Sequence, residues 1–318
     1  MNSQKRRGKN RLRKDFINHL FHKAKRDPRI VLLTGDLGYN VLEEFQEEMP
    51  NQFYNLGIAE QSLLSIAAGM AKKGLRPFVY SIGNFPTMRC LEQIRNDVVF
   101  MQLPVTVVAL GAGFAYGTSG YSHYLIEDFS ALSAFSIDIY SPEGPGSAKV
   151  ALEKVLESNK PAYIRLGRGH ECNSQIAIQS MKVDEIVIPP TTDVVFLSFG
   201  PIADEVDSAI QQIRERNISA IHITVGAISN LNLVLKAVAN SNVPIITVEE
   251  HVLRGGFGSL VLEMNQVSSL KLLRIGVGSF DNEVIGSQEF MRQHYGLSAK
   301  SIEQSALKFL SDITNSYG

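Results

Sequence analysis

Short apolar runs alternate with helix-period segments along almost the whole chain, and this alternation constrains the fold more than any other feature. In the first part, the run LPVTVVAL (103–110) is as apolar as a strand covered on both faces requires. Helices between successive strands are typical of a parallel sheet with helices on both faces. The expected strands of this part are 29–36, 76–82, 103–110, 136–142 and 161–167, and the expected helices are 63–74, 89–100 and 145–158.

The alternation weakens after residue 167 and resumes after the proline-containing run VIPPTT (187–192). A second set of strands is expected at 193–200, 219–225, 243–251 and 271–277, with helices over 202–216, over 231–239, from about 256 and from about 299. The sequence therefore predicts an α/β protein with two doubly wound domains, of which the second is smaller. The predicted boundaries are a basic tail at 1–14, a first domain at 15–175, a linker at 176–192 and a second domain at 193–318.

The overall charge argues against two classes of partner. The net charge is −1, so there is no global electrostatic reason to expect binding to nucleic acid or to a membrane surface. The basic N-terminal segment lacks the apolar run of a signal peptide. The two cysteines, Cys90 and Cys172, are too few for a disulfide framework and have no metal-ligand spacing. This cysteine usage fits a reducing compartment, and we expect a cytoplasmic protein.

Glu60 lies at the mouth of an otherwise apolar helix, in the run FYNLGIAEQSLLSIAAGMAKKG (53–74). A carboxylate there can cap the helix, because the free N–H groups and the dipole stabilise a negative charge. Alternatively, an acid held in an apolar site can exchange a proton with a bound ligand near neutral pH. Spacing alone leaves both interpretations open.

Three other residues lie in loops that follow strands, where ligands of parallel sheets bind. Phe85, in SIGNFPTMR (81–89), could stack on a flat heterocycle or fold onto the core. His123 ends a glycine-rich loop and is either structural or a hydrogen-bonding group for a polar substrate. Arg168 could clamp a phosphate or carboxylate, or form a surface ion pair. In the second domain, VEEHVLRGGFGS (248–259) predicts a domain or subunit contact.

Four motifs together resemble one family. NLGIAEQSLLSIAAGMAKKGLRPFV, CLEQIRNDV, GTSGYSHYLIEDFSAL and TVEEHVLRGGFGS occur in the order seen in transketolase-like, thiamine-diphosphate-dependent proteins. The resemblance covers roughly residues 28–312 and only the C-terminal half of such proteins, which is a pyrimidine-binding domain followed by a transketolase C-terminal domain. The tail of 1-deoxyxylulose-5-phosphate synthase is similar, and split transketolases encode this half as a separate subunit.

The resemblance implies a cofactor-binding role for four residues. It gives Glu60 a hydrogen bond to the aminopyrimidine ring of thiamine diphosphate, which favours the tautomer that activates the thiazolium carbon. It makes Phe85 the aromatic residue that stacks on this ring, and it assigns Ile82 and Arg89 to the same surface.

On the substrate side, the resemblance implies that His123 contacts the donor sugar, with Ser119 beside it, and that Arg168 binds a phosphate. Two positions depart from the family pattern. Many transketolases have Asp-Gly where this chain has Ser119-Gly120, and a histidine where it has Gly111. Both changes remove polar contacts to an ordinary ketose phosphate, which makes a modified sugar more plausible.

The diphosphate-binding domain, with its Gly-Asp-Gly…Asn magnesium motif, has no match, and TGDLG (34–38) is only superficially similar. The resemblance therefore implies that Mg²⁺ ligands come from a separate N-terminal-half subunit, in an α2β2 assembly in which this chain dimerises. The function expected is transfer of a two-carbon ketol unit between sugars or sugar phosphates. The alternatives are the beta subunit of a 2-oxo acid dehydrogenase first component and a non-catalytic scaffold with the same fold.

Overall fold

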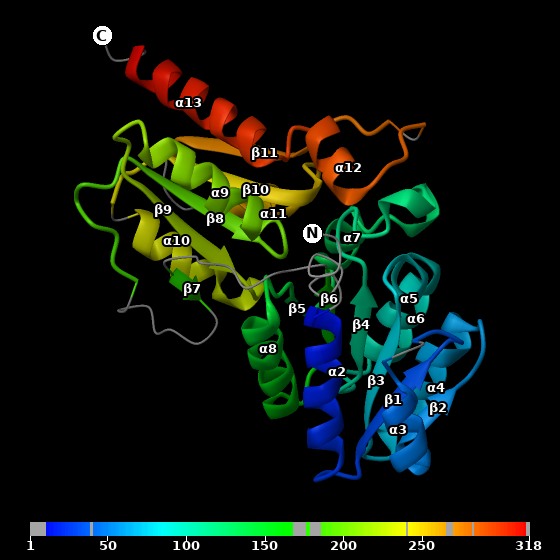
Figure 1. The fold of residues 1–318 in the computed structure, drawn as a ribbon. Helices are drawn as coiled ribbons and strands as arrows, with labels where there is room; N and C mark the ends of the chain where they lie inside the picture. The colour runs from blue at the N-terminus through cyan, green and yellow to red at the C-terminus, as the bar shows by residue number, and fades with distance from the viewer. Residues whose placement is uncertain are drawn as a thin grey trace.

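The described residues of the computed structural model form two parallel β-sheets, one in each half of the chain (Figure 1). The structure describes residues 11–38, 41–167, 176–178, 186–239, 241–264, 270–281 and 283–315. Both sheets are covered by helices on two faces, so the predicted α/β class with two doubly wound domains is confirmed.

The first sheet has the strand order β2-β1-β3-β4-β6-β5. Its strands are β1 (Ile30–Thr34), β2 (Phe53–Asn55), β3 (Arg76–Ile82), β4 (Thr106–Leu110), β5 (Asp138–Tyr140) and β6 (Ala162–Leu166). Every pair of neighbours is parallel, with Leu32 opposite both Phe53 and Phe78. The carboxyl ends of the strands therefore meet at one edge, and the loops that leave this edge lie together.

Alternate side chains of the first sheet enter two separate cores, because successive residues of a strand point to opposite faces. Ile30 and Leu32 pack against α2 (Arg11–Ala24) and α8 (Pro145–Glu157). Val31 and Leu33 enter the opposite core with α4 (Glu60–Lys72). The remaining helical segments of this domain are α3 (Glu43–Glu48), η1 (Pro50–Gln52), α5 (Asn84–Thr87), η2 (Met88–Cys90), α6 (Leu91–Gln93), η3 (Ile94–Val99), η4 (Gly117–Ser119), η5 (Tyr121–His123) and α7 (Asp128–Leu132).

The second sheet has the order β11-β10-β8-β9-β7, again with parallel neighbours. Its strands are β7 (Ile176–Ile178), β8 (Val194–Phe199), β9 (Ala220–Val225), β10 (Ile245–Val252) and β11 (Leu272–Val277). The helical segments are α9 (Ala203–Arg214), η7 (Ile228–Asn230), α10 (Leu231–Ala239), α11 (Phe257–Met264), α12 (Gln288–His294) and α13 (Ala299–Asn315). Helices α9 and α13 cover one face of this sheet, and α10 and α11 cover the other.

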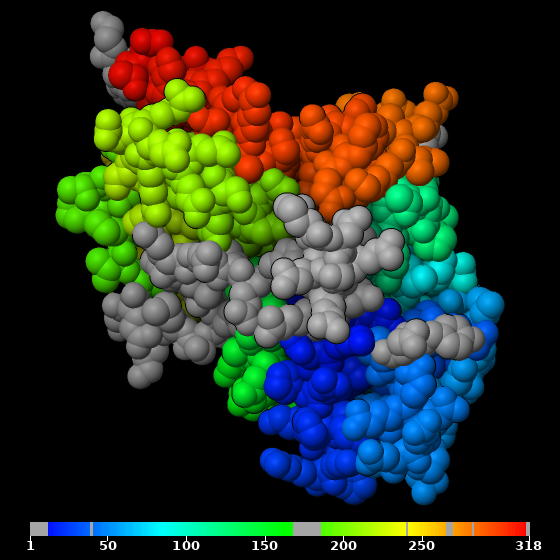
Figure 2. Space-filling model, in the orientation of Figure 1, coloured from blue at the N-terminus to red at the C-terminus, as the bar shows by residue number. Residues whose placement is uncertain are grey.

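The two halves of the chain touch beside the loop that carries His123. In the space-filling view, the orange surface around α12 lies directly against the blue-green surface of the segment that includes η4 and η5 (Figure 2). Further along the same boundary, the backbone N–H of Val252 donates to the carbonyl oxygen of Ile126 at 2.9 Å. The second domain therefore borders the carboxyl-end loops of the first sheet.

The structure differs from the predicted boundaries at both linking segments. Helix α2 begins at Arg11, inside the expected basic tail at 1–14, because Leu12, Phe16 and Leu20 recur at helical spacing and are buried. Strand β7 lies inside the expected linker at 176–192 and pairs with β9 at the edge of the second sheet. Residues 1–10 and 179–185 lie outside the described residues.

The segment after β3 also differs from prediction. Phe85 was expected in a loop, but it belongs to the short helix α5. The helix expected at 89–100 is divided into η2, α6 and the π-helix η3. Single π-turns are common at functional sites, and η3 packs against α4, the helix that begins at Glu60. In the described ranges, no helix is both long enough and apolar enough to cross a membrane.

Candidate functional site

Glu60 is a buried acid at the start of helix α4. Its side chain is 2% exposed, and Leu63, Leu64 and Ala67 behind it are part of the core. The N-cap residue of this helix is Ala59, whose side chain forms no capping hydrogen bond, and Glu60 is the acid of the first turn. Oε2 of Glu60 accepts a hydrogen bond of 2.7 Å from Nη1 of Arg89. Glu60 therefore combines a place in the first helical turn with a specific charged partner.

Arg89, Phe85 and His123 extend this pair into a cluster. The Arg89 side chain is 46% exposed, and its guanidinium lies over the Phe85 ring, 4.8 Å from the ring centroid. On another side, the rings of Phe85 and His123 meet edge to face, with centroids 5.3 Å apart. The structure therefore brings together four of the residues that the sequence predicted for the site.

Polar contacts hold the two loops of this cluster against each other. Nδ2 of Asn84 donates to the carbonyl oxygen of Ser122 at 2.8 Å, which ties α5 to the segment before His123. Oγ of Ser122 lies 3.0 Å from Nδ1 of His123 and orients the imidazole ring. Burial, and to a smaller extent the charge of Glu60, raise the pKa of the Cys90 thiol to about 12. Cys90 therefore stays protonated near neutral pH and is not a reactive group.

Gly35 lies close to the loop that precedes Glu60. A Cβ atom on Gly35 would lie 3.0 Å from the carbonyl oxygen of Gly57 and 3.7 Å from Oε1 of Glu60. Oδ1 of Asn55 accepts hydrogen bonds from the backbone N–H groups of Asp36 and Gly57. The sequence reasoning did not identify Gly35 or Asn55, because their role depends on two loops that meet only in the folded chain.

The other predicted residues have less definite surroundings. Ile82 is half-buried at the carboxyl end of β3. Ser119 is exposed at the end of η4, on the loop that also carries His123. Arg168 lies outside the described residues. The structure therefore places Ser119 near His123 in the chain and leaves the proposed role of Arg168 as a prediction.

A buried polar network lies directly behind the cluster. Oδ2 of Asp128 accepts hydrogen bonds from the Tyr163 hydroxyl and from Nε of Arg165, both at 2.8 Å. The Tyr163 hydroxyl also lies 3.0 Å from Oγ1 of Thr87, at the end of α5. All four of these side chains are buried. The network fixes the helix that carries Phe85, although no sequence motif indicated it.

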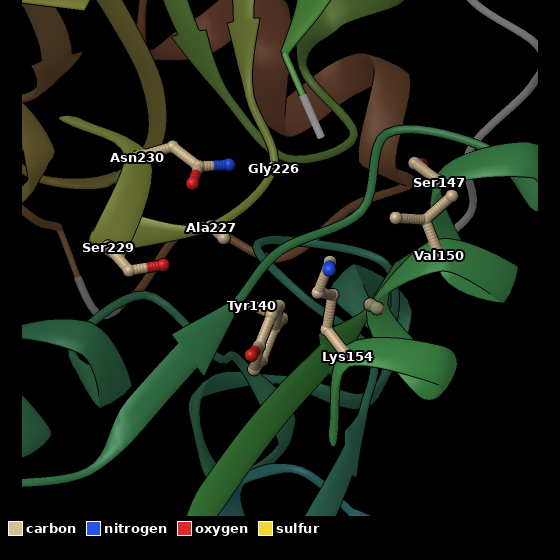
Figure 3. A pocket seen from close by; sticks show the side chains of 9 residues that line it. Tyr140, Ser147, Val150, Lys154, Gly226, Ala227, Ser229 and Asn230 are labelled. Atoms are coloured by element: carbon tan, nitrogen blue, oxygen red, sulfur yellow. The ribbon is translucent and has the colours of Figure 1, made fainter. Parts of the chain in front are cut away.

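A small cavity of about 60 Å³ lies elsewhere, between α8 and the segment that follows β9 (Figure 3). Lys154 points into it from one side, and Ser229 and Asn230 point into it from the other. Its remaining lining residues are Tyr140, Ser147, Val150, Ala151, Gly226 and Ala227. None of the predicted site residues lines this cavity, so it is separate from the Glu60 cluster.

Comparison with known families agrees with this architecture in both halves. Residues 12–172 match the model of the transketolase pyrimidine-binding domain, and residues 185–302 match that of the transketolase C-terminal domain. The first match contains Glu60, Phe85, Arg89 and His123.

Several curated relatives match over nearly the whole chain. One subunit of the apulose-4-phosphate transketolase of Phocaeicola vulgatus is 30% identical over 306 residues, which cover 94% of this chain and 97% of that protein. A putative transketolase C-terminal section of Methanocaldococcus jannaschii is 29% identical, with 93% and 95% covered. A 1-deoxy-D-xylulose-5-phosphate synthase of Clostridium perfringens is 29% identical, but the match covers only 48% of that longer protein.

Solved structures show the same fold. A structure described as a split gene transketolase, inactive beta4 tetramer, has a TM-score of 0.77 and 25% identity, with 94% of this chain and 98% of that chain covered. A transketolase from Pichia stipitis has a TM-score of 0.78, and the match covers 46% of its length. Family models, full-length relatives and fold agree, and the chain therefore belongs to the transketolase family, of which it spans the pyrimidine-binding and C-terminal domains.

Proposed function

We propose that this chain is the C-terminal subunit of a two-component transketolase, which transfers a two-carbon ketol unit between sugars or sugar phosphates with thiamine diphosphate. The observation that carries this proposal is the cluster of Glu60, Arg89, Phe85 and His123. When bound, thiamine diphosphate supplies the nucleophilic carbon and the electron sink for cleavage of a carbon–carbon bond.

The residues present fit the aminopyrimidine ring of this cofactor. Phe85 offers an aromatic surface, and Glu60 offers a buried carboxylate. One oxygen of Glu60 is bound to Arg89, while in the described part of the chain we find no hydrogen bond to the other oxygen, Oε1. An acceptor of this kind in a dry site can bind a ring N–H and hold its proton. In this proposal Glu60 binds the ring, and Phe85 and Ile82 set its plane.

Arg89 has two roles in this proposal. Its guanidinium keeps one oxygen of Glu60 occupied and so orients the other toward the ligand. The same group covers part of the Phe85 ring, so it must shift when a heterocycle stacks there. Because nearly half of the Arg89 side chain is exposed, this movement costs little desolvation energy.

His123 is proposed to contact the sugar donor, since it lies at the end of the glycine-rich loop and against Phe85. Ser119 and Gly111 stand where many transketolases have an acid and a second histidine. The proposal therefore includes an unusual donor. The name of the relative from Phocaeicola vulgatus specifies apulose 4-phosphate, which supports the inclusion of that sugar among the donors tested.

The diphosphate and Mg²⁺ are proposed to bind to a separate N-terminal-half subunit, in an α2β2 assembly. Within the described ranges, no group of three or more His, Cys, Asp or Glu side chains is arranged to hold a metal ion. The name of the full-length relative from Phocaeicola vulgatus makes it one subunit of a transketolase, and a similar tetramer of one split-gene chain is described as inactive. Both descriptions support the requirement for a partner.

The test is reconstitution with a separately encoded chain that carries the diphosphate-binding domain. The complex is given thiamine diphosphate, Mg²⁺ and an aldose phosphate acceptor, and ketose phosphates, apulose 4-phosphate and nucleotide-linked sugars are screened as donors. Replacing Glu60 with glutamine is expected to lower kcat at least about 100-fold, because proton transfer by a positioned side chain contributes that much.

The matched control is Glu157→Gln, which removes an exposed carboxylate from the Lys154–Glu157 pair. It is expected to leave both kcat and cofactor affinity unchanged. If the Glu60 variant folds and retains more than half of the ketol-transfer activity, the proposed role of Glu60 is wrong. A parallel assay supplies 2-oxo acids and a lipoyl acceptor. If the complex decarboxylates a 2-oxo acid there and transfers no ketol unit from any sugar donor, the proposed reaction is wrong.

A further inference from the structure

We infer that Glu250 and Arg292, in the C-terminal domain, form a positioning pair that holds the loop at 113–125 and thereby places His123. The functional meaning of His123 rests on the proposed function, but the conformation of the loop does not. The sequence predicted only that the segment 248–259 makes a domain or subunit contact.

The base of the loop is closed by two backbone hydrogen bonds between Gly113 and Leu125, each of 3.0 Å. Phe114, the first residue inside the loop, is then bound by a residue of the C-terminal domain. Oε1 of Glu250 accepts a hydrogen bond of 2.8 Å from the backbone N–H of Phe114. Because this bond is buried, its loss would leave a desolvated donor without a partner.

Glu250 is itself held firmly. Its Oε2 accepts two charge-assisted hydrogen bonds from Arg292, one from Nε at 3.0 Å and one from Nη2 at 2.8 Å. Gln288 donates to both carboxylate oxygens, at 3.0 and 3.1 Å. Although burial lowers the pKa of Arg292, the charges of Glu250, Asp204 and Glu205 raise it overall, so the guanidinium stays charged.

The glycine at the loop base makes this approach possible. Gly113 has φ +67°, and a Cβ atom on it would lie 2.4 Å from the carboxyl carbon of Glu250. The carboxylate therefore occupies the space that any other side chain at 113 would fill.

Aromatic contacts hold the rest of the loop from the same side. Phe114 stacks on Tyr295, with ring centroids 5.3 Å apart and planes 9° apart. The hydroxyl of Tyr124, the residue after His123, lies 3.1 Å from the carbonyl oxygens of Gly117 and Val284. The C-terminal domain thus fixes both ends of the segment that presents His123. Since a displacement of about 1 Å at a reacting group can cost about 100-fold in rate, this fixation matters for transfer.

The experiment compares Glu250→Ala and Glu250→Gln with Glu303→Ala, in the full chain and in the reconstituted complex. Glu303 accepts a hydrogen bond from Nε of Arg216 in the same domain, away from the loop, so its variant reports general weakening of that domain. The Glu250→Gln variant keeps the side-chain volume and one acceptor oxygen. It therefore tests the inference even if the Glu250→Ala variant does not fold. The readouts are hydrogen–deuterium exchange of residues 113–125, kcat and KM for the sugar, and the Kd for thiamine diphosphate.

In the Glu250→Ala variant, we expect the loop amides to exchange about tenfold faster, which corresponds to about 1.4 kcal/mol, and we expect a smaller increase with glutamine. In the complex, kcat/KM for the sugar should fall about tenfold or more, while the Kd for cofactor stays within about twofold, because Glu60 and Phe85 do not touch this pair. Loop exchange in both Glu250 variants equal to that of Glu303→Ala would overturn the inference. So would faster loop exchange with unchanged kcat and KM. If the wild-type complex transfers no ketol unit, the proposed function fails, and the exchange data alone decide whether Glu250 holds the loop.

Discussion

Replacing Asp128 with asparagine is expected to destabilise the folded chain strongly, because it breaks a fully buried ion pair and keeps the shape. Asp128 accepts three hydrogen bonds, one from the Tyr163 hydroxyl and two from the Arg165 guanidinium. The Arg165 side chain is only 1% exposed. Because a guanidinium group is not deprotonated in proteins, Arg165 remains a cation inside the core when Asp128 is replaced by the neutral asparagine, although the charge that raises its pKa in the wild type is then gone.

The magnitude follows from that uncompensated charge. Breaking a buried pair by removing one partner costs about 3–5 kcal/mol, and we expect the lower end because Arg165 also donates to the carbonyl oxygen of Leu125. For a domain of about 150–250 residues, a loss of about 3 kcal/mol corresponds to a fall of about 6–12 °C in Tm.

The assay is urea unfolding followed by far-ultraviolet circular dichroism, for Asp128→Asn, Arg165→Met and the double variant. The double variant should recover part of the stability that Asp128→Asn loses, because removing both charges leaves neither of them unpaired. Glu157→Gln serves as the control, since its pair with Lys154 is exposed. A loss below about 1 kcal/mol in Asp128→Asn would refute the reasoning, because it would put the pair in the range of surface ion pairs.

Two further predictions concern the boundary between the domains. Burial lowers the pKa of His251 to about 4, so between pH 6.5 and 4 the unfolded chain binds a proton that the folded chain excludes, and stability falls as the pH falls. The wild type should therefore lose about 2 kcal/mol more unfolding free energy between pH 7 and pH 5 than the His251→Leu variant does. If the difference in unfolding free energy between the two proteins does not change with pH, this prediction is wrong. Gly113→Ala should lower the unfolding free energy measured in urea by about 2–4 kcal/mol, because alanine would have to adopt a positive φ and its Cβ would collide with Glu250. An unchanged unfolding free energy would show that the loop moves aside and would contradict this prediction.

The sequence predicts the regular elements of this fold well, because both doubly wound domains depend on local alternation. Strand β3 has the predicted bounds 76–82, and helix α10 has the predicted bounds 231–239. The elements that were missed depend on tertiary contacts. Strand β7 has three residues and exists through its pairing with β9, and the basic residues of α2 mask its buried stripe.

The site shows the same division. Glu60, Phe85 and His123 are candidates because each lies in a loop or helix mouth after a strand, but their proposed roles come from the resemblance to transketolases. The partner of Glu60 is 29 residues away in the chain, and nothing in the spacing indicates that Arg89 would reach it. The contact between Glu250 and Phe114 spans 136 residues and follows from the packing of one domain on the other.

The close fit between Gly113 and Glu250 limits which domains of related proteins can be joined in one chimeric chain. A chimera that joined the pyrimidine-binding domain of one relative to the C-terminal domain of another would inherit the two sides of this contact from different parents. A bulkier residue at 113 opposite a glutamate at 250, or a shorter acid opposite a glycine, would leave either a steric overlap or an unfilled space at the base of the loop. Residues 113 and 250 lie in different domains but must fit each other, so a domain exchange has to take both residues from the same parent.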